Sequence, residues 1–295
     1  MNLSRRSMLT AAALGTAAAG APSLMTRAAA ADTAPRDAGY TRLAFVEDFN
    51  SPDVIDWSGR GLPGKSFYLD LPWTNRMTPT DRIRVENSSL IVDQAWTNQN
   101  VAVTSLSARS GEGRSFGYGL YEARMRFDPS LGIRSNGYPS FWMLPKGQLH
   151  NTQFKRHGEI DVFEAYHAPG EPYTGFFAGT VHDSQPQHGW NYRHVQNRNN
   201  VTFRNITTPQ WHTYGALWEP GKVTWYFDGA VTTSVSYGAD RLPSAATWDP
   251  IGGQDVSESG TFSVLDQRAN EGMGIIFGTA PGWPLEIDWV KVWTR

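Results

Sequence analysis

Short segments in which apolar and polar residues alternate recur along the chain, separated by turn residues. The first, residues 43–46, reads LAFV, and the last, residues 285–293, alternates almost to the end of the chain. Residues 121–127 alternate small or apolar residues with charges, as a half-buried strand does. No long helical periodicity, internal repeat or low-complexity linker interrupts this pattern after residue 41. Many short, regularly spaced strands predict an all-β sandwich or barrel.

Two turn sequences predict which strands pair. The polar run Asn87-Ser88-Ser89 lies between apolar segments at 83–86 and 90–92, and Asp228-Gly229 lies between segments at 224–227 and 231–233. A two-residue Asp-Gly connection is typical of tight hairpins because both residues tolerate positive φ. We therefore expect an antiparallel hairpin at each place. The simplest organisation of all segments is one domain over residues 41–295.

The first 31 residues have a different character. Arg5-Arg6 precedes an Ala-rich, moderately apolar run over residues 10–21, and small residues cluster at 28–31. This order is typical of a bacterial export signal with a small-residue cleavage site, and the arginine pair favours the twin-arginine type. The apolar run is too short to span a bilayer. We expect residues 1–31 to be a signal peptide, residues 32–40 a short leader, and the protein to be secreted without a membrane anchor; a terminus with no targeting role is the alternative.

Composition narrows the function classes. The formal net charge of −2 gives no reason to expect nucleic acid or an anionic membrane as a partner. The chain has no cysteine, so neither a disulfide nor a thiolate nucleophile or metal ligand is available. Aromatic residues make up 13%, with 12 tryptophans, which suits a sandwich core and also a groove that stacks on sugar rings. We expect most of these tryptophans to lie in the core.

The residues best suited to chemistry lie in the sequence HGEIDVFEAYH, residues 157–167. Glu159, Asp161 and Glu164 fall within six residues, and the β-branched and aromatic residues between them favour a strand. On a strand Glu159 and Asp161 share a face, whereas Glu164, five residues after Glu159, would point to the other. One extra residue in a β-bulge near Val162-Phe163 would return Glu164 to the shared face, with Ile160 in the core behind.

Like charges crowded on one strand face raise the pKa of one carboxyl beside an ionised partner. Retaining glycoside hydrolysis needs such a pair, roughly 5–5.5 Å apart, with one carboxylate as nucleophile and the other carboxyl as acid. With a bulge, the Cα atoms of the two glutamates would be on the order of 13 Å apart, a gap that two leaning side chains could largely close. An aspartate between them could tune the charge of one. A solvated acidic strand face would produce the same sequence.

The segments, taken in order, resemble glycoside hydrolase family 16, which includes laminarinases, lichenases, agarases and carrageenases. The matching motifs are FVEDFN at 45–50, FGYGLYEARM at 116–125, YPSFWMLP at 138–145, WHTY at 211–214 with Trp218, WYFDG at 225–229 and IDWVKVW at 287–293. Each motif alone is weak, but all of them in this order, with the acids between, are specific. The resemblance covers nearly all of residues 41–295. It implies a concanavalin-A-like β-jelly-roll sandwich of two antiparallel sheets.

The resemblance also implies roles for the acids. Glu159 matches the nucleophile of the family, Glu164 the general acid/base, and Asp161 the assisting carboxylate. The six-residue spacing matches the bulged variant of the motif and counts against a lichenase-like enzyme. No cofactor is required in this family.

The resemblance also suggests roles for residues outside the acid motif. Trp142 matches an aromatic residue that stacks on sugar near the cleavage point, with core packing as the alternative. His182 matches a histidine that hydrogen-bonds a catalytic carboxyl or the sugar, with a structural role as the alternative. Asp288 matches a ligand of a structural calcium ion, although Asn87-Ser88-Ser89 replaces the usual Asn-Gly turn. Tyr138 stands where laminarinases usually carry Trp, and Asn75 lies in the loop 72–76; we expect both at the substrate-binding groove.

Substrate choice stays open at this point. The loops 72–76, 131–137, 168–174 and 183–198 are expected to edge the groove and set specificity. We expect a monomeric, secreted, retaining endo-β-glycanase whose partner is a polysaccharide, with β-1,3-glucan narrowly ahead of agar-like galactans. The alternatives are a transglycosylase that uses the same residues and a non-catalytic carbohydrate-binding protein on the same fold. Loss of a catalytic glutamate would indicate the latter, and both are present.

Overall fold

The computed structural model describes residues 39–72, 74, 76–93, 100–128, 139–150, 157–165, 177–184, 193–198, 209–236, 265, 269–278 and 284–295. The chain divides after Ala31 into two units, and every described residue lies in the second, Asp32–Arg295. The predicted signal peptide and most of the predicted leader lie outside the described residues. In the part of the chain that is described, no helix is long and apolar enough to cross a membrane.

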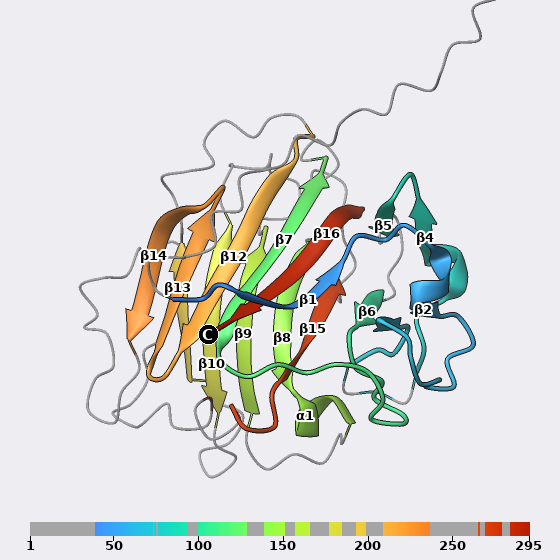
Figure 1. Ribbon diagram of the computed structural model, residues 1–295, viewed down its shortest axis with the longest axis horizontal. Helices are drawn as coiled ribbons and strands as arrows, with labels where there is room; N and C mark the ends of the chain where they lie inside the picture. Colours follow the sequence, from blue (N-terminus) through green and yellow to red (C-terminus); the bar gives the residue numbers. More distant parts are fainter. Residues whose placement is uncertain are drawn as a thin grey trace, which may run out of the picture. The chain divides into compact units, whose positions relative to one another are not determined.

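Two eight-stranded sheets make up the described part of the chain (Figure 1). Sheet A, in front in Figure 1, contains in spatial order β14 (Ala230–Ser236), β13 (Lys222–Phe227), β12 (His212–Glu219), β7 (Gly119–Phe127), β16 (Leu285–Thr294), β5 (Ser89–Val92) and β4 (Ile83–Glu86), with β1 (Arg42–Glu47) paired to β16. Sheet B contains β11 (Arg193–Arg198), β10 (Ala178–Ser184), β9 (His157–Glu164), β8 (Ser140–Pro145), β15 (Met273–Gly278), β6 (Ala102–Thr104), β3 (Phe67–Tyr68) and β2 (Ile55–Asp56). All pairs are antiparallel except β2 with β3. The predicted two-sheet, all-β sandwich is confirmed.

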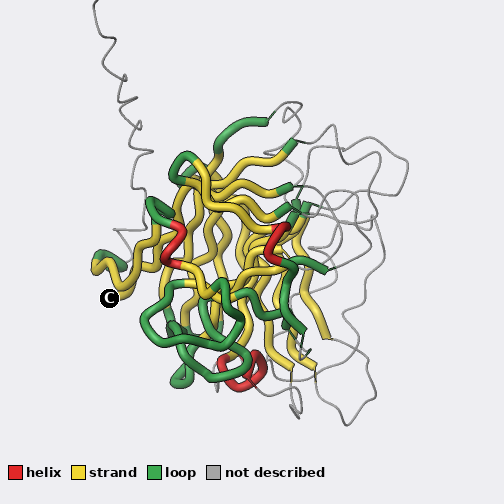
Figure 2. The backbone as a smooth tube through the Cα atoms, turned by 90° about the vertical axis from the view of Figure 1, so that its right-hand side faces the viewer, coloured by secondary structure: helices red, strands yellow, loops and turns green. Residues whose placement is uncertain are grey.

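Helical segments in the described ranges are short, and strands dominate the view in Figure 2. They are α1 (Lys146–His150) and the 3-10 turns η2 (Pro52–Val54) and η3 (Thr80–Arg82). Of these, α1 directly follows β8, and the Gln148 side chain accepts a hydrogen bond from the backbone N–H of Gly158, 2.7 Å away. The helix therefore helps to fix the start of β9, one residue before Glu159.

The main core lies between the two sheets, as the alternating pattern requires. Sheet A contributes Trp218 and Trp225, and sheet B contributes Phe141, Ile160 and Phe163, all fully buried. Aromatic side chains of this size each bury roughly 150–250 Å² and dominate core energetics. The intervening residues of each sheet B strand consequently lie on its outer face, away from sheet A. That face carries the predicted site.

Both predicted hairpins are confirmed, and their turns have the expected backbone. Asn87 and Ser88 have φ of 52° and 55° between the paired residues Glu86 and Ser89. Asp228 and Gly229 have φ of 46° and 77° between β13 and β14. Positive φ at both central positions gives a turn whose twist matches that of the flanking strands.

One predicted loop is instead partly a strand. The polar stretch 183–198 was expected to edge the groove, but β10 continues to Ser184 and residues 193–198 form β11, which pairs with β10 at the edge of sheet B. Polar and basic residues suit an edge strand because they discourage pairing with another chain. The sequence RHVQNR therefore did not reveal the strand through hydrophobic alternation.

Candidate active site

The pairing of β9 with its neighbours contains the predicted bulge. On the β10 side, Asp161 pairs with Thr180 and Glu164 with Ala178, so three steps along β9 correspond to two along β10. On the β8 side, Asp161 pairs with Trp142 and Phe163 with Phe141, which leaves Val162 as the extra residue. The bulge proposed from the odd spacing is confirmed at this position. The acids consequently share the outer face of sheet B.

The chain around the bulge has the burial that this placement requires. Ile160, Val162 and Phe163 are all fully buried in the core between the sheets. Two adjacent core residues, Val162 and Phe163, would be impossible in a regular strand, in which side chains alternate. The bulge resolves this conflict, and it is the reason that Glu164 returns to the same face as Asp161.

Asp161 connects the two glutamates. Its carboxyl group hydrogen-bonds both Glu159 and Glu164, and its side chain is almost completely buried. Burial raises the pKa of Asp161 well above its ordinary value, and the negative charge of Glu159 raises it further. Hydrogen bonds with Glu164 and Thr180 act in the opposite direction. The result is a group of three adjacent carboxyls in which the pKa of the central one is raised.

The neighbouring strand β10 supplies two further polar side chains. His182 lies across from Glu159, and its Nε2 is 2.9 Å from Asp161 Oδ2 and 3.8 Å from Glu159 Oε1. Thr180 Oγ1 donates a long hydrogen bond of 3.4 Å to Glu164 Oε2. Thr180 was not singled out in the sequence, although its position two residues before His182 places it on the same strand face. Each glutamate thus has its own polar neighbour on β10.

Trp142, on β8, lies on the same outer face and pairs with Asp161 of β9. Its side chain is 3% exposed, and its Nε1 donates to the backbone oxygen of Gly278 at 2.8 Å. It belongs to a second apolar cluster that covers the outer face of sheet B next to the acids, with Leu71, Ala102, Leu106, Leu144, Leu149 and Ile276. The structure therefore places Trp142 beside the acids with most of its ring packed. Its stacking on sugar stays a prediction.

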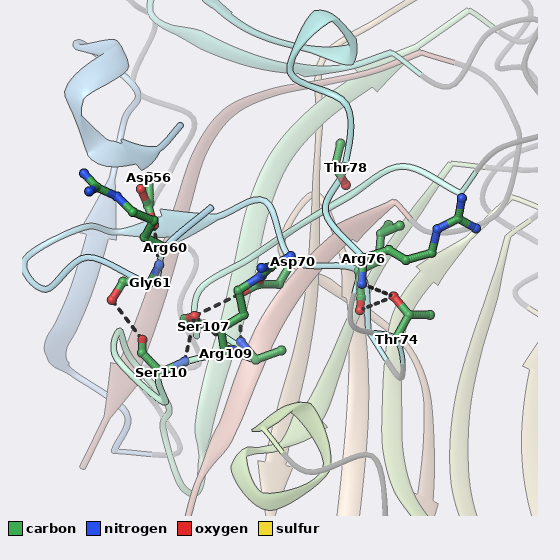
Figure 3. A network of polar contacts seen from close by, with 12 residues as sticks. Asp56, Arg60, Gly61, Asp70, Thr74, Arg76, Thr78, Ser107, Arg109 and Ser110 are labelled. Carbon is green, nitrogen blue, oxygen red and sulfur yellow. Dashed lines mark hydrogen bonds and ion pairs between the residues drawn. The ribbon is translucent and has the colours of Figure 1, made fainter. Parts of the chain in front are cut away.

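Tyr138 and Asn75, the other two expected substrate contacts, lie outside the described residues. The loop that contains Asn75 is nevertheless anchored on both sides. Asp70 bridges to Met77, and the Leu71 N–H donates to Arg76 O. Thr74 Oγ1 accepts from the Arg76 N–H (Figure 3). Leu71 packs in the Trp142 cluster on β6, β15 and β8. Three strand spacings, on the order of 14 Å, separate β6 from β9, so this loop begins within a few sugar lengths of the acids.

A buried carboxylate holds that loop. Asp70 Oδ2 accepts hydrogen bonds from Ser107 Oγ at 2.9 Å and from the Ala108 N–H at 2.8 Å, and Arg109 Nε lies 3.1 Å from Oδ1 (Figure 3). Such charge-assisted bonds are stronger than neutral ones. On the other side of the loop, Thr78 Oγ1 donates to Ala102 O and accepts from the Ala102 N–H. No local pattern in the sequence indicates these contacts, because Asp70 and Ser107 are far apart along the chain.

Asp288 does not have surroundings that fit calcium. Its Oδ2 lies 2.7 Å from Arg124 Nη1. Calcium requires six to eight oxygen ligands, and a guanidinium at this distance repels a divalent cation. Within the described ranges, the only group of three or more acidic or histidine side chains close enough to share an ion is Glu159, Asp161 and His182. The contact with Arg124 therefore counts against Asp288 as a calcium ligand.

Comparison with known proteins decides the family. A family model described as glycosyl hydrolases family 16 matches residues 72–249, more than half of the chain. The chain belongs to glycosyl hydrolase family 16. The family assignment made from the motifs is thus confirmed, and the protein is a glycoside hydrolase of a family in which retention of configuration is general.

Relatives within family 16 agree with this assignment. The glucan endo-1,3-beta-glucosidase of Cryptopygus antarcticus is 25% identical over 276 residues, 85% of this chain and 92% of that protein. Glucan endo-1,3-beta-glucosidase A1 of Niallia circulans is 31% identical over 121 residues, 39% of this chain and only 15% of that protein. The laminarinase catalytic domain of Thermotoga maritima superimposes with a TM-score of 0.51 at 15% identity, covering 86% of this chain and 98% of that one. The last likeness supports the jelly-roll fold.

Proposed function

We propose that the protein is an endo-β-glycanase that cleaves β-1,3-glucan with retention, with Glu159 as nucleophile and Glu164 as general acid/base. One observation carries the proposal: the bulge in β9 brings both glutamates to one face, with Asp161 hydrogen-bonded to each. A retaining mechanism needs two carboxyl groups close enough to act on one glycosidic bond. A solvated acidic strand face would need neither the bulge nor the buried Asp161 between the glutamates.

The reaction proceeds in two displacements. Glu159 forms a bond to the anomeric carbon while the glycosidic C–O bond breaks, and Glu164 transfers its proton to the departing oxygen. Glu164, now ionised, then takes a proton from water, whose oxygen bonds to the anomeric carbon and releases Glu159. All protons move between Glu164, the sugar oxygen and water, so the carboxyl pair and water are sufficient for hydrolysis.

Asp161 assists by holding a proton beside the nucleophile. Because burial and the Glu159 charge raise its pKa, Asp161 can donate a hydrogen bond to the Glu159 carboxylate, which keeps Glu159 ionised. His182 lies against both groups and orients the Asp161 carboxyl. Thr180 orients Glu164 from the other side. These contacts support separate roles for the two glutamates.

The names of the relatives support β-1,3-glucan as the substrate. Two curated proteins that this chain resembles are glucan endo-1,3-beta-glucosidases, and one of them aligns along most of both chains. A β-galactan is the second candidate, because Tyr138 and His182-Asp183 depart from the laminarinase pattern. A transglycosylase would use the same residues with a sugar hydroxyl in place of water.

We further propose that the enzyme is exported and acts as a monomer on polysaccharide outside the cell, with no membrane anchor. The support for export is the Arg5-Arg6 pair, the short apolar run after it and the small residues at 28–31. Amino-terminal sequencing of the protein recovered from the culture medium of its host tests this. A mature chain that begins near residue 32 supports export; a full-length chain retained in the cells contradicts it.

A panel of polysaccharides tests the activity itself. Residues 32–295 are incubated with laminarin, mixed-linkage glucan, agarose, carrageenan, arabinogalactan and xyloglucan, and products are sized by mass spectrometry. We expect oligosaccharides from laminarin, absent with Glu159→Gln, and initial products of retained configuration by NMR. Cleavage of agarose alone would move the substrate to galactan. Binding without cleavage by the wild-type protein, or an inverted first product, would overturn the proposed mechanism.

A further inference from the structure

One side chain of sheet A reaches across the core to the backbone of the acid-bearing strand. Trp225 in β13 is fully buried between the sheets. Its indole Nε1 donates a hydrogen bond to the backbone oxygen of Asp161, 2.8 Å away. Asp161 is the last residue of β9 before the pairing shifts on both sides. The bond therefore ends where the bulge begins.

This hydrogen bond compensates for the bulge. An extra residue disrupts the ladder of backbone hydrogen bonds locally, and buried backbone oxygens need a partner. An indole N–H from the opposite sheet supplies one at Asp161. The same bond ties the irregular part of β9 to β13 in the opposite sheet. The backbone oxygen of Trp225 in turn accepts a hydrogen bond from Thr232 Oγ1, at a shift in the pairing of β13 with β14.

A glycine on β10 makes room for the indole. A Cβ atom on Gly179 would lie 2.3 Å from Trp225 Nε1 and 2.6 Å from its Cδ1 and Cε2 atoms. The pyrrole edge of the indole therefore rests against the β10 backbone, between Ala178 and Thr180, which pair with Glu164 and Asp161. A glycine inside a strand often marks such a close approach. Trp225 thus contacts both strands that form the site, from behind.

We propose that Trp225 is a positioning residue that fixes the bulge of β9 and thereby holds Glu159 and Glu164 in register with one another. The inference rests on the proposed function, because it concerns the separation of the two glutamates. A displacement of about 1 Å at reacting groups can cost a hundredfold in rate. Loss of the bulge would shift the register after Asp161 by one residue and turn Glu164 to the core face.

The first test is Trp225→Phe, compared with Trp218→Phe. Both replacements remove an indole that is fully buried in the same core cluster, but Trp218 lies on β12, whereas the hydrogen bond to the Asp161 oxygen comes from Trp225. We expect Trp225→Phe to lower kcat about tenfold to a hundredfold while KM changes less than about twofold. Trp218→Phe should leave both constants within about twofold at temperatures below its Tm.

Two further changes separate the hydrogen bond from packing. Gly179→Ala displaces the indole without removing it, and Gly215→Ala on β12 is its control, because a Cβ there would meet nothing closer than 3.2 Å. Gly179→Ala should reproduce the kcat loss of Trp225→Phe, and the double variant should be no slower than Trp225→Phe alone. Replacing Trp225 by the benzothienyl analogue, which keeps the ring and lacks the N–H, should reproduce it as well.

A readout that does not need turnover completes the test. The Asp161 carboxyl, faced by Glu159, Glu164, Thr180 and His182, is titrated by ¹³C NMR in each variant. We expect its pKa to fall toward the ordinary range in Trp225→Phe and in the benzothienyl protein, because the loosened bulge admits water, and to stay unchanged in Trp218→Phe. An unchanged kcat and an unchanged Asp161 pKa in folded Trp225→Phe would overturn the inference while the wild type stays active. A wild type that cleaves no glycan would instead refute the proposed function, and the NMR result would still decide whether Trp225 holds the bulge.

Discussion

Two strands of this protein carry alternating charged residues on the outside of the sandwich, but the neighbours of these charges differ. On β7 in sheet A, Arg124 and Arg126 each face an acidic residue of β16, at 2.7 Å in both cases. On β9 in sheet B, the charged residues are all acidic, and their polar neighbours include one another. The difference is between charges that neutralise each other and charges that crowd together.

This contrast distinguishes structural from reactive acids. An acid that pairs with an arginine pays little free energy for being partly buried, because the arginine compensates its charge. For the same reason it is a poor proton donor and a poor nucleophile. Crowding raises the pKa of one carboxyl beside an ionised partner, which costs stability and provides the separate proton donor and nucleophile that glycoside hydrolysis needs.

The largest effect is expected from the β9 glutamates. Glu159→Gln should lower kcat/KM by at least about 10⁴-fold, because the covalent step is lost. Glu164→Gln should lower it by about 10²–10⁴-fold. Neither change should lower Tm, since each removes a like charge from the cluster. Reducing-sugar assays on laminarin and thermal unfolding measure both quantities.

A buried glutamate of sheet A is the matched control. Glu122 accepts a hydrogen bond from Trp293 Nε1, and Glu122→Gln should keep activity within about twofold because Gln still accepts this bond.

Azide rescue distinguishes the roles of the two β9 glutamates. With an activated aryl glycoside as substrate, azide should restore turnover of Glu164→Ala and give a glycosyl azide of retained configuration. With Glu159→Ala it should give the glycosyl azide of inverted configuration. Rescue in the reverse pattern would exchange the two assignments.

A smaller loss of activity, together with a gain in stability, is expected for Asp161→Asn. The pKa of Asp161 is higher in the folded chain than its ordinary value of 3.8. Folding therefore binds a proton between these two values, and the free energy of unfolding falls as pH rises through that window. The slope from this one group is at most about 1.4 kcal/mol per pH unit. Asp161→Asn should remove it.

Urea unfolding of both proteins between pH 4 and neutral pH tests the sign. The variant should be the more stable one at the upper end of the range, with kcat reduced about tenfold to a hundredfold because Asn cannot hold the shared proton. Parallel stability curves for the two proteins would mean that Asp161 has an ordinary pKa. That result would remove its proposed role beside Glu159.

Local sequence signals predicted most of what the fold requires. Asn87-Ser88 and Asp228-Gly229 indicated hairpins because few residues tolerate positive φ, and the structure has both turns. The odd offset between Glu159 and Glu164 indicated the bulge, since one extra residue was needed to bring both acids to the same face. These inferences succeeded because each depends on residues only a few positions apart.

Contacts between distant segments could not be predicted in this way. Nothing near Asp161 in the sequence shows that an indole 64 residues later donates to its backbone oxygen. The motif match placed Asp288 at a calcium site, but its contact with Arg124 depends on the register of β7 with β16. Likewise, β11 forms a strand because it pairs with the edge of β10. The polar sequence of β11 alone does not indicate a strand.

On the opposite sheet, a moderate effect on stability alone is expected. Arg124→Met leaves the nearly buried Asp288 carboxylate without its arginine, which should cost about 1–3 kcal/mol of unfolding free energy. Asp288→Asn combined with it should cost less than the sum of the two single changes. Activity should stay within about twofold of the wild type. Millimolar CaCl₂ or a chelator should not shift Tm; a clear rise in Tm with CaCl₂ would support the calcium site that the family resemblance suggested.

The smallest effect is expected one pair further along the same strands. Arg126 and Glu286 are also 2.7 Å apart, but their side chains are 40% and 24% exposed, against 20% and 9% for Arg124 and Asp288. Exposed pairs contribute about 0.2–1 kcal/mol, and Arg126 keeps its contact with the Trp211 ring, 4.6 Å from the ring centre, without its acid. Glu286→Gln should therefore cost under about 1 kcal/mol, and the cost should shrink in about 1 M NaCl, where screening acts over about 3 Å. Because the two pairs share strands, face and distance, a larger and less salt-sensitive loss for Arg124→Met would show that burial, not geometry, determines what a paired charge contributes here.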